Sequence, residues 1–214
     1  VSAFGGIVAF NSTVDKETAI NLKEIFLECV VAPSFQEEAL EILKPKKNLR
    51  ILKLSKNMLP QKQQTYVKSI MGGLLIQDID DIEDKAENWI SVTETVATDQ
   101  QILDLNFAWK ICKHVKSNAI VIAKKQKTIG IGAGQMNRVG AAKIALEAAK
   151  DDCVGAVLAS DGFFPFADTV ELANEYGISS IIQPGGSLRD TESINMCNRK
   201  GISMLFTQKR HFLH

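Results

Sequence analysis

The sequence lacks several features that would assign a class of function directly. Its 25 basic residues balance 25 acidic residues, so no excess charge is available for nucleic acid or an anionic membrane. No apolar run approaches the roughly 20 residues that a bilayer-spanning helix needs, and no basic-then-apolar leader resembles a signal peptide. These absences predict a soluble globular protein of the cytoplasm, with neither a nucleic-acid nor a membrane partner.

Cysteine and histidine are also scarce. The four cysteines, Cys29, Cys112, Cys153 and Cys197, form no C-x-x-C pair, and each lies in or beside an apolar segment. We therefore expect buried free thiols. Only the histidines near the C-terminus approach the short spacing typical of zinc ligands, so we expect no zinc site.

Apolar sequence is plentiful. With 214 residues, of which 45% are hydrophobic, the chain can fold as one large domain or two small ones. Short apolar runs alternate with segments of helical periodicity, which is typical of α/β layers. In the first part we expect strands at 6–10, 29–32 and 50–54 and helices at 16–26 and 37–43. Because the first residue is Val1 rather than Met, we expect the chain to be part of a longer protein.

The alternation returns after a looser polar stretch. We expect helices at 101–115, 138–150, 169–176 and 191–199, a hairpin at 118–134, and strands at 156–159, 179–183 and 203–207. Strands separated by single helices imply right-handed crossovers and a largely parallel sheet with helices on its faces. The predicted organisation is one α/β unit at 1–55, a linking segment at 56–98 and a second α/β unit at 99–214.

Unusual residues gather where the strands of the second unit end, and ligands of open α/β sheets bind at the carboxyl ends of strands. The segments are GIGAGQMNR, SDGFFPFAD, QPGGS and QKRHFLH.

In the first segment, GIGAGQMNR, glycines at 130, 132 and 134 leave backbone N–H groups accessible, and Asn137 can cap the next helix. Arg138 then falls in a first helical turn, where the macrodipole disfavours a cation. A bound anion would offset this; the alternative is a glycine hairpin followed by a solvated arginine. The segment is no dinucleotide fingerprint, because Gln135 stands where the last glycine belongs.

The other segments also allow two interpretations. QPGGS offers two free N–H groups and a hydroxyl, as an anion cradle or as an ordinary turn. The aromatic run at 163–166 either packs under its own helix, with Pro165 near the first helical position, or forms a surface on which a flat aromatic ligand stacks.

Two groups of basic residues are judged in the same way. Arg210, His211 and His214 belong either to a site or to a frayed tail. Lys113 and His114 complement the macrodipole at a helix end, and we interpret them as structural. Asn118 is either a turn residue or an amide directed at the site.

Six segments together resemble one family. They are VSAFGGIVAFN, VVAPSFQEEALEILKPKKNLRIL, MGGLLIQD, HVKSNAIVIAKKQKTIGIGAGQMNRV, LASDGFFPFADTVELANEYGISSIIQPGGSLRD and FTQKRHFLH. In collinear order from Val1 to His214 they resemble the bacterial form of the bifunctional purine-biosynthesis enzyme that joins AICAR transformylase to IMP cyclohydrolase. The resemblance implies a three-layer α/β fold of two cytidine deaminase-like units, with mixed, largely parallel sheets. This chain would hold the C-terminal part of the first unit and all of the second.

The resemblance also implies a reaction. The 5-amino group of AICAR attacks the formyl carbon of 10-formyltetrahydrofolate, without zinc, in a homodimer whose transformylase sites lie at the subunit interface. The cyclohydrolase domain and the catalytic Lys-His of the family's KH-x-NPCG segment are absent here, and Lys113-His114 does not match that segment. We therefore expect this chain to be inactive alone.

The residues that the resemblance implies fall into three sets. Matches to positions near the reacting groups are Asn118 and His214. Matches to nucleotide-binding positions are Gly5, Glu28, Asn118, Arg138, Phe163 and Arg210, with an aspartate able to stand where Glu28 does. Matches to folate-side positions are Val139, Asp168, Ser187 and Leu188. Gly162 replaces the alanine more usual in SDAFFPF. Phe163–Phe166 would then wall the place where nucleotide and pterin meet.

Two other readings of the function stay open. The strand-end residues alone would suit a non-catalytic nucleotide-binding or anion-binding α/β module, which a KH-x-NPCG segment upstream would argue against. A folded interaction domain without a small-molecule site would show no heat stabilisation by AICAR or folates.

Overall fold

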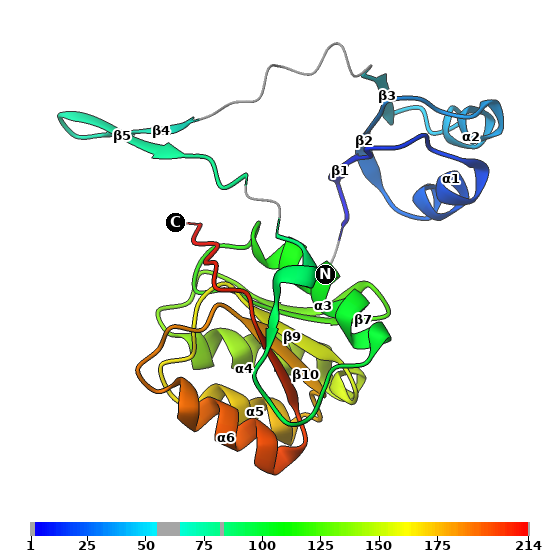
Figure 1. Ribbon diagram of the computed structural model, residues 1–214. Coiled ribbons are helices and arrows are strands. Elements are labelled where there is room, and N and C mark those ends of the chain that lie inside the picture. The colour runs from blue at the N-terminus through cyan, green and yellow to red at the C-terminus, as the bar shows by residue number, and fades with distance from the viewer. Residues whose placement is uncertain (1–2, 55–64, 82–83, 214) are drawn as a thin grey trace. The chain divides into compact units, whose positions relative to one another are not determined.

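The computed structural model describes residues 3–54, 65–81 and 84–213, and the chain forms two compact units (Figure 1). The first unit ends at Ile79 and the second begins at Asp80. Within the described ranges, no helix is long and apolar enough to cross a membrane.

The first unit contains a parallel three-stranded sheet in the order β1-β2-β3. Its elements are β1 (Gly6–Ala9), α1 (Lys16–Lys23), β2 (Leu27–Ala32), α2 (Glu37–Leu43) and β3 (Arg50–Lys53). Buried side chains such as Val14, Leu27, Val30 and Leu43 form its core. The helix predicted at 16–26 ends at Lys23, because the chain must turn into β2, and the Phe26 carbonyl accepts the Gly5 N–H there.

An antiparallel hairpin of β4 (Thr65–Ile70) and β5 (Gly73–Asp78) completes the residues assigned to the first unit. Every residue of both strands is exposed, including apolar Leu74, Leu75 and Ile76. The sequence pattern places this segment in the linker. Its strands escaped prediction because apolar residues point to both faces and leave no alternation.

The second unit is built around a six-stranded sheet in the order β6-β11-β10-β9-β7-β8. Its strands are β6 (Ile90–Ser91), β7 (Ile120–Lys124), β8 (Lys127–Gly132), β9 (Val157–Ser160), β10 (Ser180–Gln183) and β11 (Ser203–Phe206). Strands β9, β10 and β11 run parallel, whereas β7 is antiparallel to both its neighbours and β6 is antiparallel to β11.

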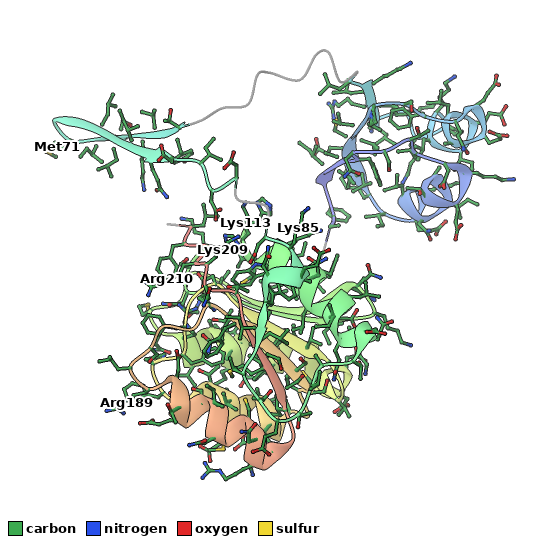
Figure 2. The ribbon with its side chains drawn as sticks, in the orientation of Figure 1. Met71, Lys85, Lys113, Arg189, Lys209 and Arg210 are labelled. Carbon is green, nitrogen blue, oxygen red and sulfur yellow. The ribbon has the colours of Figure 1, made fainter. Side chains whose placement is uncertain are left out.

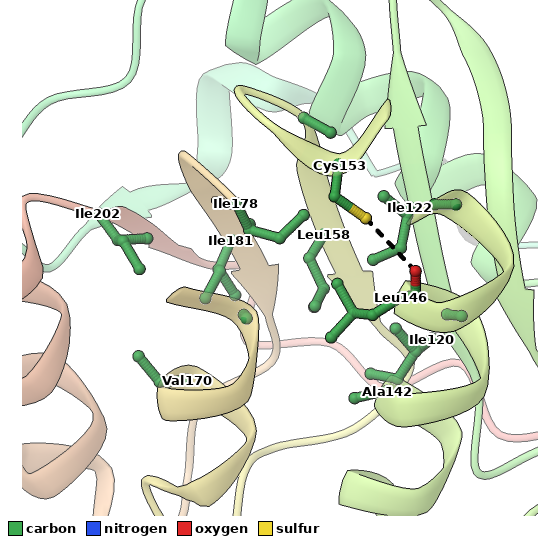
Figure 3. Close-up of a cluster of buried hydrophobic side chains, with 14 of the residues drawn as sticks. Ile120, Ile122, Ala142, Leu146, Cys153, Leu158, Val170, Ile178, Ile181 and Ile202 are labelled. Carbon is green, nitrogen blue, oxygen red and sulfur yellow. Dashed lines mark hydrogen bonds between the residues drawn. The ribbon is translucent and has the colours of Figure 1, made fainter. Parts of the chain in front are cut away.

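Helices cover both faces of this sheet. The helices are α3 (Asp99–Cys112), α4 (Arg138–Ala149), α5 (Asp168–Glu175) and α6 (Asp190–Lys200). On one face, Leu105 and Trp109 of α3 pack with Val121, Val157 and Ile182. On the other, the helices after α3 cover a core that includes Leu146, Leu158 and Ile181 (Figure 3). The predicted three-layer α/β class with a mixed sheet is confirmed.

Residues 84–98 contribute to this second unit, although the sequence pattern places them in the linker. Trp89 is buried among the side chains around α3, and β6 pairs with β11 at the edge of the sheet. Thr98 and Gln101 then form a capping box that starts α3. A two-residue strand is too short to show an alternating pattern, so β6 gave no signal.

The strand directions bring five segments to one edge of the sheet. The carboxyl ends of β8, β9, β10 and β11 lie there, together with the start of the antiparallel β7. The segments are 117–119, 133–138, 161–166, 184–189 and 207–213. Each of the last four segments holds the greater part of one strand-end motif that the sequence singled out.

Candidate functional site

Arg138 is a buried cation at this edge of the sheet. It occupies the first turn of α4, where the Asn137 side chain caps the helix by accepting the Gly140 N–H at 2.7 Å, as predicted. The guanidinium is 8% exposed, and its Nη1 forms an ion pair with the carboxylate of Asp161. The alternative of a solvated arginine is therefore wrong. The anion that pairs with Arg138 in this structure is the chain's own Asp161.

The Arg138 guanidinium is held from several sides. Nη1 also donates to Ser160 Oγ at 3.0 Å, and Nη2 donates to Asn118 Oδ1 at 2.9 Å. Asn118 Nδ2 in turn donates to the Gln135 carbonyl at 2.7 Å. Burying an ion pair costs desolvation energy that is recovered only when further hydrogen bonds satisfy both partners. This network supplies them and joins three of the five segments.

Asp161 was not among the predicted site residues, yet it connects more of the site than any of them. Its side chain is fully buried and accepts hydrogen bonds from Ser117 Oγ at 2.5 Å and from the Ala119 N–H at 3.1 Å, besides pairing with Arg138. Its carbonyl accepts the His211 N–H at 3.2 Å. The sequence signal that could have indicated Asp161 is its position, as an ionisable residue directly after an apolar strand segment.

The aromatic run divides its side chains between core and surface. Phe164 is fully buried in the core under α4 and α5, so packing explains that ring. Phe163 and Phe166 instead line open cavities together with Pro165. Helix α5 begins at Asp168, so Pro165 lies before the helix rather than in its first turn.

Two cavities meet at Phe163 and Pro165. The first, named here the amide pocket, has a volume of about 320 Å³ and is lined by Asn118, Met136, Asn137, Arg138, Phe163, Pro165 and Phe212. The second, named the serine pocket, has about 300 Å³ and is lined by Phe163, Pro165, Phe166, Gly186, Ser187, Leu188 and Arg189. Both have the size of small-molecule sites. Their shared residues form a ridge against which two ligands could meet.

Two arginines lie over the aromatic rings of these pockets, and Figure 2 shows both on the same side of the second unit. The guanidinium carbon of Arg210 is 5.0 Å from the Phe163 ring centroid, and that of Arg189 is 4.8 Å from the Phe166 centroid. These distances suit cation–π contacts. A flat ligand with an anionic group would find a ring and a cation together in either place.

QPGGS is not an anion cradle. The Gly185 N–H donates to Gln183 Oε1 at 2.8 Å, and the Gly186 N–H donates to Asp190 Oδ2 at 2.7 Å. Both glycines have positive φ angles, which the turn requires. The ordinary-turn alternative is confirmed, and the turn serves to present Ser187 and Leu188 to the serine pocket.

The glycines before Arg138 serve packing rather than anion binding. Gly130 and Gly132 pair with β7 in the sheet ladder, and a Cβ on either would overlap a carbonyl oxygen of α4. The Gly134 N–H donates to the Lys116 carbonyl at 2.7 Å. The prediction of accessible N–H groups in this segment was wrong, because strand pairing and the close approach of β8 to α4 use these positions.

The tail is packed as far as Leu213, so the frayed-tail alternative is wrong for the described residues. His211 is 2% exposed, its Nδ1 lies 2.5 Å from Asp80 Oδ2, and its ring lies against Trp109. Lys113 Nζ lies 3.4 Å from the same carboxylate, at the end of α3. The Leu213 carbonyl accepts the Ser117 N–H at 2.9 Å. The tail therefore holds the segment that carries Asn118.

The other predicted residues are distributed more widely. Asp168 starts α5, and its carboxylate accepts the N–H of Thr169. Val139 is half-buried in α4 and lines neither pocket. Gly5 and Glu28 belong to the first unit, where Glu28 pairs with Arg50 at 3.4 Å. His214 lies outside the described residues. The roles of all these residues stay predictions.

The four cysteines are free and buried, as predicted. Burial raises the pKa of the Cys112 thiol well above its ordinary value, the charge of Asp161 raises it further, and Arg138 opposes both. Among residues 3–54, 65–81 and 84–213, no three His, Cys, Asp or Glu side chains gather in a way that could hold a metal ion.

Comparison with known proteins identifies the family of the chain. The family model described as AICARFT/IMPCHase bienzyme matches residues 1–148. The bifunctional purine biosynthesis proteins PurH of Prochlorococcus marinus strains AS9601 and MIT 9312 are each 81% identical over all 214 residues, and that of strain NATL1A is 59% identical. The chain spans 41% of the length of these relatives. The chain therefore belongs to the AICARFT/IMPCHase bienzyme family.

Proposed function

We propose that this chain is the C-terminal part of an AICAR transformylase that acts in purine biosynthesis. The observation that carries the proposal is the ridge of Phe163 and Pro165 between two pockets. The amide pocket holds Asn118 and Arg138, which match nucleotide-binding positions. The serine pocket holds Ser187 and Leu188, which match folate-side positions. The two sets were assigned from sequence; Asn118 and Arg138 line only the amide pocket of the two, Ser187 and Leu188 only the serine pocket, and Phe163 of the nucleotide set lines both.

The reaction joins the contents of the two pockets. The amino nitrogen of AICAR forms a bond to the formyl carbon of 10-formyltetrahydrofolate, and the bond from that carbon to N10 then breaks. A base must take a proton from the amine, and tetrahydrofolate leaves with a proton on N10. An oxyanion develops on the formyl oxygen between these steps and needs donors or a cation.

The residues of this chain supply binding and orientation for these steps. Asn118 uses one acceptor site and one donor on protein partners, so its amide keeps capacity to hydrogen-bond the AICAR carboxamide. Arg138 keeps donors not used by Asp161, Ser160 and Asn118. The exposed Arg210 lies over the Phe163 ring, so a bound nucleotide could stack its base on Phe163 and pair its phosphate with Arg210.

Other parts of the proposal depend on the family resemblance. The proton-accepting Lys-His segment lies upstream of these residues, with His214 near it. The parent protein carries IMP cyclohydrolase in a separate N-terminal domain, is cytoplasmic, and forms a homodimer with transformylase sites at the interface. Gly5, Glu28, Val139 and Asp168 contribute to nucleotide and folate binding in that assembly, without zinc.

The test is formyl transfer from 10-formyltetrahydrofolate to AICAR, followed by absorbance, for this chain and the full-length parent side by side. We expect activity only in the parent, because the base is absent here. Activity in the fragment would place the base within these residues. Inactivity of both, with AICAR still bound, would instead favour a non-catalytic nucleotide-binding module.

Replacing Arg138 by alanine in the parent should weaken AICAR binding about tenfold or more, since hydrogen bonds from charged groups contribute about 1.5–3 kcal/mol. Calorimetric titration with AICAR measures this directly. Lys143→Ala is a matched control on the same helix, because that lysine is solvent-exposed and pairs with Glu147 at 3.9 Å. Equal affinity in the wild type and the Arg138 variant would refute the role of Arg138.

A further inference from the structure

Asn118 and Arg138 are both fixed by the same carboxylate. Asp161 accepts a hydrogen bond from the residue before Asn118, through Ser117 Oγ, and from the residue after it, through the Ala119 N–H. It also pairs with the Arg138 guanidinium, which reaches Asn118 Oδ1 from the other side. Loss of this one charge would release both ligand-facing groups together.

The buried position of the Asp161 carboxylate ties it to the Arg138 guanidinium. The carboxylate is fully buried, and its positive partner Arg138 is 8% exposed. An unpaired charge at such a depth is costly, so the guanidinium is held tightly where the carboxylate is. Asp161 therefore fixes the position of Arg138 in the amide pocket, although Asp161 is not among the residues that line that pocket.

Gly162 determines how closely the guanidinium approaches. A Cβ on Gly162 would overlap Arg138 Nη2 and would lie 2.9 Å from Cε1 of Phe212, another residue lining the amide pocket. The φ angle of Gly162 is not positive, so backbone conformation does not demand glycine there. Glycine provides space. With no Cβ at this position, the Arg138 guanidinium can lie against the backbone of Gly162.

We propose that Asp161 and Gly162 are positioning residues for the amide pocket: Asp161 fixes the Arg138 guanidinium against Asn118, and Gly162 provides the space it occupies. This rests on the proposed function for the identity of the ligand, AICAR. Neither residue is among those that line the amide pocket. Both act on Arg138, Asp161 in addition to its bonds on either side of Asn118, and this shared effect distinguishes them from residues that merely stabilise the fold.

The first experiment replaces Asp161 by asparagine in the full-length parent. Asparagine keeps the size and an acceptor oxygen but removes the charge that holds Arg138. We expect the calorimetric Kd and the KM for AICAR to rise about tenfold or more, since bonds to charged groups carry that much. The KM for 10-formyltetrahydrofolate should change less than about twofold, because the serine pocket lies beyond the ridge.

Asp104→Asn is the matched control. Asp104 is another buried aspartate of the second unit, and its carboxylate accepts hydrogen bonds from the Lys125 and Gln126 N–H groups at 2.9 and 2.7 Å. It lies in α3, and the two N–H groups that it accepts follow the end of β7, whereas Asn118 precedes the start of that strand. Its replacement should lower the melting temperature and leave both KM values unchanged. Equal rises of both KM values in the Asp161 variant would overturn the proposal.

The second experiment tests whether Gly162 acts through Arg138. Its first variant leaves the Asp161–Arg138 ion pair with both of its charges. Gly162→Ala should raise the Kd for AICAR about threefold or more, because the guanidinium must move aside. In an Arg138→Ala background the same change should have no further effect, as expected for two residues that act through one contact. If Arg138→Ala does not fold, Arg138→Lys serves as the background.

The outcomes separate the two proposals. An effect of Gly162→Ala that persists undiminished without the arginine would overturn the positioning role. A wild-type parent that binds AICAR but transfers no formyl group would refute the proposed function, while the titrations would still test Asp161 and Gly162. A wild-type parent that binds no AICAR would refute both.

Discussion

Replacing Gly132 by alanine should destabilise the second unit, although the change adds only one methyl group. A Cβ at this position would overlap the carbonyl oxygen of Ala141 in α4 and would lie 2.7 Å from its carbonyl carbon. Real Cβ atoms essentially never come within 3.0 Å of such neighbours. These atoms belong to the helix backbone, so no side-chain rotation can relieve the overlap, and β8 and α4 must separate.

The expected cost follows from that separation. Overpacking a well-packed interior by a methyl group costs about 1–3 kcal/mol, and the upper part of that range applies where backbone must move. Urea unfolding followed by tryptophan fluorescence measures it, because Trp89 and Trp109 both lie in the second unit. With a urea dependence of about 2 kcal/mol per molar, the midpoint should fall by about 1 M or more.

Lys127→Ala provides the control, since Lys127 lies in the same strand with its side chain exposed. That change should alter the free energy of unfolding by less than about 0.5 kcal/mol. If Gly132→Ala were as mild as this control, the close approach of β8 to α4 would not explain the glycine, and the packing argument would fail.

Three further predictions concern charge and burial. A hydrogen bond from the Thr18 N–H lowers the pKa of Asp15 below its ordinary 3.8. The Asp15 cap therefore stabilises α1 fully above that pH, and the stabilisation is lost as pH falls through the folded pKa. Asp15→Ala should remove this acid dependence from melting curves followed by circular dichroism. Burial raises the pKa of Cys197 to about 12, so iodoacetamide at pH 8 should modify it only in the unfolded chain, and labelling of the native protein would contradict its burial. Trp109→Phe removes a 3.0 Å hydrogen bond to buried Asp84 and should cost about 1–3 kcal/mol in urea unfolding, whereas an unchanged midpoint would show that water replaces the indole.

Local signals predicted the second unit well because its elements obey local rules. Asn137 caps α4 as its position before an apolar periodic segment indicates. The three parallel strands and the helices between them follow from regular spacing and crossover handedness. Elements without such rules were missed: β6 is two residues long, and the β4–β5 hairpin has no single apolar face.

The site was predictable only in part, because its pairings join residues distant in sequence. The sequence indicated that Arg138 needs an anion, but it could not show that Asp161, 23 residues away, supplies one. Nor could it separate Phe164, which faces the core, from Phe163, which faces the pockets. The glycines at 130 and 132 suited either an anion or a close helix, and only the position of α4 decides between them.

The exposed β4–β5 hairpin has a consequence for how the protein exchanges hydrogen with solvent. Every residue of β9 is buried, whereas every residue of β5 is exposed. Amides of a central strand exchange only through global or near-global opening, but a two-stranded hairpin is marginally stable and opens locally. The amide of Ile76 should therefore exchange orders of magnitude faster than that of Leu158. A single exchange rate averaged over the whole chain would describe neither strand.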